Sequence, residues 1–131
     1  MARDYTKIRA WQLADELAIK IYGATKGCPK SENFGLTSQM RRAAVSVAAN
    51  IVEGSARKHQ NEYLQFLYTS IGSLTELGYF LRFSNKIGYL NKQDFDVLNL
   101  QYQKTIKTLR ALINFIEKTK KPEVQSRKSK V

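Results

Sequence analysis

The sequence has little of the material from which disulfide-linked, metal-binding or loop-rich proteins are built. Among its 131 residues there is one cysteine, one histidine and two prolines. A single cysteine excludes an intramolecular disulfide and fits a reducing compartment, so we expect a cytoplasmic protein. The histidine, His59, leaves no cysteine–histidine cluster for zinc and has no glutamate three residues before it, which excludes the ligands of a di-iron helical bundle.

Long hydrophobic runs and catalytic groupings are missing too. The longest stretch without a charged residue, Tyr63 to Thr75, is too short to cross a membrane. The first residues lead into no apolar segment of the kind found in secretory signals. The sequence also lacks a glycine-rich phosphate loop and paired acids with a base, so we expect neither an enzyme nor a cofactor.

Positive charge is what the sequence has in excess. It contains 22 lysines and arginines against 11 aspartates and glutamates, a formal net charge of +11. Residues 118–131 hold six of the basic residues and one acid, and the run after Pro122 has no apolar face to pack. We therefore expect one folded domain over residues 1–119 and a disordered basic tail over 120–131.

Apolar residues recur at three- and four-residue spacing in four stretches, at about 5–26, 36–53, 61–87 and 92–118. This period predicts four amphipathic helices with short connections, hence an all-α, up-down-up-down antiparallel four-helix bundle. Gly27, Gly54 and Gly88 each follow such a stretch, which predicts a helix end with positive φ at each. The third stretch carries two apolar stripes, which indicates more than one packing neighbour or a partner subunit. We favour an oligomer.

A polar stripe runs along the second predicted helix. Arg42, Ser46, Asn50 and Glu53 follow one another at steps of four, four and three, so they share one face. Glu76 interrupts the apolar third helix and invites pairing with an arginine. This set could hold a ligand or an RNA phosphate, but we favour a structural polar network that fixes helix register.

The fourth predicted helix has no acid between Asp96 and Glu117. A face of one charge sign is typical of polyanion binding through phosphates, which is independent of base sequence, whereas ordinary surface charge is the alternative. We predict nucleic-acid contact through nine residues in and around this helix and the ends of the second: Arg41, Arg57, Lys58, Lys104, Lys107, Arg110, Lys118, Lys120 and Lys121.

Residues 32–54, ENFGLTSQMRRAAVSVAANIVEG, resemble the signature of a bacterial family of four-helix-bundle proteins encoded in intervening sequences of large-subunit rRNA genes. The likeness extends to residues 10–14, 62–67 and 72–77, with Val52 at a position where the family usually has alanine. The resemblance implies a ring-like homopentamer. It also implies kinship with the accessory variability protein of diversity-generating retroelements, a basic pentamer that works with a reverse transcriptase and nucleic acid.

Two functions follow as hypotheses. The first is a non-enzymatic, homo-oligomeric bundle, pentameric by resemblance, that binds RNA or DNA through phosphate contacts. The alternative is a protein-interaction adaptor that serves a reverse transcriptase in a system like a diversity-generating retroelement. Both predict self-association and no membrane partner.

Overall fold

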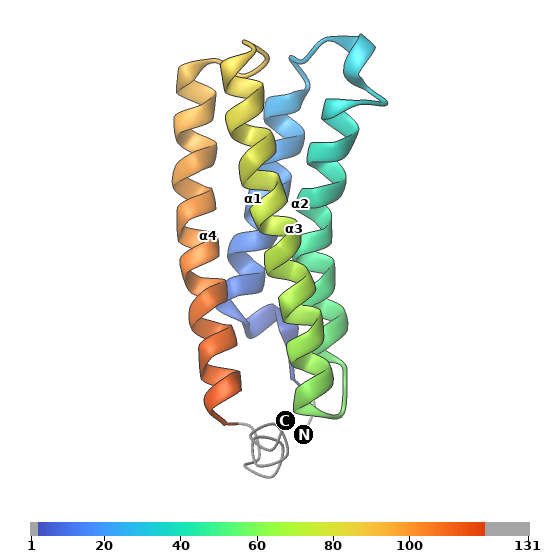
Figure 1. The fold of residues 1–131 in the computed structure, drawn as a ribbon, viewed down its shortest axis with the longest axis vertical. Coiled ribbons are helices and arrows are strands. Elements are labelled where there is room, and N and C mark those ends of the chain that lie inside the picture. Colours follow the sequence, from blue (N-terminus) through green and yellow to red (C-terminus); the bar gives the residue numbers. More distant parts are fainter. Residues whose placement is uncertain (1–2, 120–131) are drawn as a thin grey trace, which may run out of the picture.

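Four long helices make up the computed structural model, which describes residues 3–119 (Figure 1). They are α1 (Arg9–Thr25), α2 (Leu36–Ser55), α3 (Gln60–Lys86) and α4 (Lys92–Lys118). Short 3-10 turns, η1 (Tyr5–Lys7) and η2 (Lys30–Glu32), precede α1 and α2. Successive helices run in opposite directions, which confirms the predicted antiparallel bundle. The predicted basic tail, residues 120–131, lies outside the described residues.

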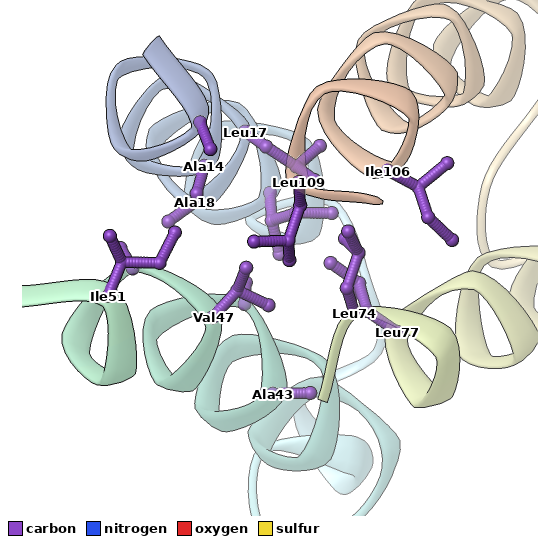
Figure 2. Packing of buried hydrophobic residues seen from close by; sticks show 14 of the residues in the cluster. Ala14, Leu17, Ala18, Ala43, Val47, Ile51, Leu74, Leu77, Ile106 and Leu109 are labelled. Carbon is purple, nitrogen blue, oxygen red and sulfur yellow. The ribbon is translucent and has the colours of Figure 1, made fainter. Parts of the chain in front are cut away.

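Each helix contacts two neighbours. α1 packs on α2 and α4, and α3 packs on the same two helices, so diagonal helices stay apart. Small residues of α1 and α2 let these two backbones approach, and larger side chains from α3 and α4 fill the centre (Figure 2). Burial of these apolar side chains is the main source of stability. Central members of the core are Ala14, Leu17, Ala18, Ala43, Val47, Ile51, Leu74, Leu77, Ile106 and Leu109.

The helix end with positive φ predicted at Gly88 is confirmed in the turn between α3 and α4. Gly88 has a φ of 84°, the left-handed conformation that a glycine after a helix supplies. Asn91 then caps α4, because its side-chain oxygen accepts a hydrogen bond from the Asp94 backbone N–H at 2.8 Å. Within residues 3–119, no residue other than glycine has a positive φ.

The prediction of a positive φ was wrong for Gly27 and Gly54, since Gly88 alone has one among residues 3–119. Gly54 lies inside α2 and is buried. A Cβ there would lie 2.7 Å from the Phe66 Cβ and 3.3 Å from the Tyr63 carbonyl oxygen. α2 and α3 therefore approach each other closely at Gly54, and the absence of a side chain there allows that contact.

The two apolar stripes of α3 are explained largely by its two neighbours within the chain. Tyr63 packs against Gly54 of α2, and the buried Ser70 hydroxyl donates to the Val47 carbonyl of the same helix at 2.7 Å. On the other side, Gly78 accommodates the ring of Tyr102 from α4. Two intramolecular interfaces thus use most of the apolar surface of α3.

A smaller apolar surface on α3 stays exposed. Tyr79 and Phe83 stack with ring centroids 6.0 Å apart and are 62% and 42% exposed. Ile87, one turn further, is 44% exposed. We call Tyr79, Phe83 and Ile87 the α3 apolar patch.

Candidate nucleic-acid interface

The basic side chains of α4 from Lys104 onward face away from the core. Lys104, Lys107, Arg110 and Lys118 are all exposed, whereas the opposite face of the helix is buried. Successive helical residues are ~100° apart and rise ~1.5 Å each, so these four cations occupy one side over ~20 Å. None of them forms a hydrogen bond or an ion pair with another residue of the described chain. We call these four residues the α4 basic face.

A second basic cluster lies where α2 ends and α3 begins. Arg57 and Lys58, both predicted to contact nucleic acid, are exposed there. The Arg57 guanidinium lies 4.8 Å from the Phe66 ring centroid and 3.2 Å from a Glu53 carboxylate oxygen. This end of the bundle also holds the C-terminal end of α4, because Gln60 donates to the Thr119 hydroxyl at 2.8 Å (Figure 1).

The structure adds Arg3 to this cluster, a residue that the sequence did not single out. Its guanidinium donates to the Arg57 carbonyl at 2.8 Å and lies 4.2 Å from the centroid of the Tyr63 ring. Burial raises the pKa of the Tyr63 phenol, and the charge of Arg3 partly offsets that rise. No local pattern marks Arg3, since its partners lie more than 50 positions away.

Arg41, also in the predicted set, lies at the other end of the bundle and is held within the fold. Its Nε donates to the Thr25 hydroxyl at 2.8 Å and its Nη2 to the Tyr22 carbonyl at 3.3 Å. The guanidinium lies 4.6 Å from the Tyr22 ring centroid. Arg41 thereby caps the C-terminal turn of α1, where a cation is favourable.

The five residues of the predicted polar network do not form one connected set of hydrogen bonds and ion pairs among the described residues. Ser46 shares a 2.9 Å hydrogen bond with Ser73 of α3, and Asn50 donates to the Ser46 hydroxyl at 3.0 Å. Arg42 is exposed and reaches only Gln39, and Glu53 pairs with Arg57.

Glu76 is exposed and joins no ion pair between described residues. Ser46 therefore lies at the α2–α3 contact and Asn50 beside it on α2, while Arg42, Glu53 and Glu76 face solvent.

The described residues contain no group of three or more His, Cys, Asp or Glu side chains that could hold a metal ion. Within 3–119, no helix is long and apolar enough to cross a membrane. Lys120 and Lys121, the last two residues of the predicted set, lie outside this range. The chemistry that the described surface offers is therefore that of exposed cations beside aromatic rings.

Comparisons with known proteins identify the family of the chain. The family model of the 23S rRNA-intervening sequence protein matches residues 6–111. A crystal structure of a protein of unknown function from the S23 ribosomal protein family of Bacteroides thetaiotaomicron is 20% identical, with a TM-score of 0.73 over 79% of this chain and 97% of that chain. At this identity the likeness shows the fold alone. No curated protein matches the sequence. Because the family model covers most of the chain, the protein belongs to the 23S rRNA-intervening sequence protein family.

Proposed function

We propose that the protein is a non-enzymatic, homo-oligomeric helical bundle that binds RNA or DNA through phosphate contacts. The observation that carries the proposal is the α4 basic face. Its four cations are exposed and share one side of the helix, and three of them lie in the stretch between Asp96 and Glu117 that contains no acid. Membership of a family named for an rRNA intervening sequence supports the same assignment.

The chemistry of this face favours phosphates over bases. Three of the four cations are lysines, which act as mobile point charges, and Arg110 alone presents a rigid pair of donors. Binding of this kind releases counterions, so its affinity falls steeply with salt. We therefore expect little preference for sequence and no strong choice between RNA and DNA.

The test is a titration of a fluorescent single-stranded RNA by anisotropy at several salt concentrations. The triple variant Lys104→Gln, Lys107→Gln, Arg110→Gln should bind more weakly, and its log–log salt slope should flatten by roughly 2–3. Absence of binding at low salt, or a flat salt dependence of the parent protein, would overturn the proposal.

A matched control removes the same charge elsewhere. Lys26, Lys30 and Lys86 are exposed and lie off α4. The triple glutamine variant at these positions should retain most of the affinity. Equal losses in the two triple variants would show that net charge alone governs binding and that α4 has no special part.

Self-association is the second element of the proposal, with a pentamer as the expected state. The α3 apolar patch supports it, because stacked, exposed aromatic side chains are typical of interfaces. Native mass spectrometry of the parent protein and of Tyr79→Ser/Phe83→Ser measures the assembly directly. We expect the double variant to shift toward smaller species, and a monomeric parent protein would contradict this element.

The same patch supports the alternative function, an adaptor that docks a nucleic-acid enzyme such as a reverse transcriptase. The adaptor predicts weak RNA binding by the isolated protein and stable co-purification with the enzyme. Strong, salt-dependent RNA binding without a partner favours the first proposal.

A further inference from the structure

The basic cluster at the end of α2 lines a cleft, whereas the α4 basic face lies along one side of a single helix. The cleft has a volume of about 500 Å³ and lies between the N-terminal segment and the last turn of α2. Three cations line it: Arg3, Arg57 and Lys58. The rest of its wall is mainly apolar, formed by Tyr5, Val52 and Ala56.

From this juxtaposition we infer that the cleft binds a nucleoside phosphate, with the phosphate between the cations and the base against the apolar wall. The inference deepens the proposed function, on which it rests for the class of ligand. A pocket of a few hundred cubic ångströms suits one small ligand, and its mixture of apolar wall and few charged groups is typical of such sites. A duplex end, with its bases paired and stacked, presents no free base to the wall.

A helix C-terminus normally repels anions, since its free carbonyl groups carry partial negative charge. Here Arg3 offsets much of this partial negative charge. Its Nη1 donates to the Arg57 carbonyl at 2.8 Å and approaches the Ser55 carbonyl at 3.5 Å. The last turn of α2 is thus capped by a cation that also faces the cleft.

Two of the cations are held in place before any ligand arrives. Arg3 stacks on Tyr63 and Arg57 stacks on Phe66, so both guanidinium groups lose little conformational freedom on binding. Glu53 offsets one charge through its 3.2 Å pair with Arg57.

Lys58 is exposed and forms no ion pair within the described chain. The lining keeps a net positive charge, and Lys58 is free to close on a phosphate.

The side chains near the mouth do not cancel this charge. Asp4 is the nearest acid along the chain, and one of its carboxylate oxygens accepts from the Thr6 N–H at 3.0 Å and from the Thr6 hydroxyl at 2.6 Å. That carboxylate caps η1, and it is not among the residues that line the cleft. Glu53, which pairs with Arg57, is not among the lining residues either, so a phosphate in the cleft meets three lining cations and no lining acid.

The experiment is a calorimetric titration of the full chain with AMP, adenosine and inorganic phosphate. We expect AMP to bind more tightly than either of its parts, because it alone supplies both phosphate and base. Lys58→Gln should lower AMP affinity by roughly five- to tenfold, since an exposed lysine–phosphate contact is lost. Tyr5→Leu should lower it by a similar factor through loss of base stacking.

The control variant is Lys26→Gln, which removes one exposed lysine far along the chain and should leave AMP affinity unchanged. Lys58 is exposed and forms no ion pair with a described residue, so its variant tests the cleft with little effect on the fold. Equal affinity for AMP and adenosine, or equal effects of the Lys58 and Lys26 variants, would overturn the inference.

Two oligonucleotide arms separate a free nucleotide from a strand. A hexanucleotide with a 5′-phosphate that competes with AMP, and loses affinity in Lys58→Gln, identifies a strand end as the ligand. Competition by the 5′-hydroxyl hexanucleotide as well identifies an internal phosphate, and competition by neither leaves the free nucleotide as the ligand.

The outcomes also distinguish this inference from the proposed function. RNA binding that depends on the α4 basic face, with no AMP binding, overturns the inference alone. AMP binding without RNA binding at any salt overturns the proposed function alone.

Discussion

Replacement of Gly54 by alanine should destabilise the protein, against the usual rule for glycine inside a helix. In an open helix, Gly→Ala stabilises by about 1 kcal/mol, because alanine restricts the unfolded chain and has the higher helix propensity. At Gly54 the added Cβ would meet the Phe66 Cβ at 2.7 Å and the Tyr63 carbonyl oxygen at 3.3 Å. Neither atom moves when a side chain changes rotamer, so α2 and α3 must separate locally.

The magnitude follows from these opposing effects. Overpacking of a tight core costs about 1–3 kcal/mol, and an obstacle attached to the backbone places Gly54 in the upper part of that range. After the gain in helix propensity, the net loss is about 1–2 kcal/mol. With a urea dependence of ~2 kcal/mol/M, the unfolding midpoint should fall by ~0.5–1 M.

The assay is urea unfolding followed by circular dichroism at one fixed protein concentration, because association makes the midpoint depend on concentration. Gly23→Ala is the matched control: Gly23 lies inside α1, and an added Cβ would meet nothing within 4 Å. It should raise stability by ~0.5–1 kcal/mol. A Gly54→Ala protein as stable as the parent would refute the close approach of α2 and α3.

Four further substitutions test the capping and burial of individual side chains. Arg41→Ala should cost about 1–2 kcal/mol in urea unfolding because two hydrogen bonds to the end of α1 are lost, whereas Arg42→Ala should change stability by less than ~0.5 kcal/mol. Asn91→Ala should cost ~1 kcal/mol through loss of the α4 cap, and an unchanged midpoint would contradict the cap.

For Tyr63, burial raises the folded-state pKa above 10.0, so the unfolded chain loses the phenol proton first. The contribution of the neutral phenol to the free energy of unfolding is fully present below pH 10, and it declines as pH rises from about 10 through the raised pKa. As pH rises from 9 to 11, the free energy of unfolding of Tyr63→Phe should therefore fall by less than that of the parent protein.

The helices and their buried faces were predictable because a 3.6-residue period of apolar side chains reports directly which side of a helix leaves water. The start of α4 could also be predicted from neighbouring residues, since Asn91 and Asp94 lie three residues apart. The structural roles of the glycines could not be predicted in the same way. Gly88, which ends a turn, and Gly54, which admits a neighbouring helix, both follow an apolar stretch, and only the position of α3 distinguishes their roles.

In the candidate site too, features contained in one segment were predictable, and features made by contacts between distant residues were not. The acid-free stretch of α4 is a property of one segment, so the sequence displays it in full. The cleft depends on Arg3 meeting Arg57 and Tyr63, contacts that no spacing rule encodes. The polar stripe of α2 failed as a single network for a related reason: its residues share a face, but the register between α2 and α3 brings Ser73, and not Glu76, to Ser46.

The two basic surfaces should respond differently to salt. Cations of the α4 basic face have no partner among the described residues, so a polyanion there displaces counterions at each of them, and affinity falls steeply with ionic strength. Arg3 and Arg57 in the cleft are already stacked and hydrogen-bonded, and an apolar wall contributes a part of the affinity that salt does not screen. AMP affinity should therefore decline far less than RNA affinity between 50 and 200 mM salt.

If the subunits form a ring, its symmetry repeats both surfaces at fixed separations, so one strand could engage several α4 faces while each cleft takes its ligand independently. Parallel salt series for AMP and RNA on the parent protein test this difference in salt dependence, and equal slopes would contradict a salt-independent contribution of the apolar wall to AMP binding.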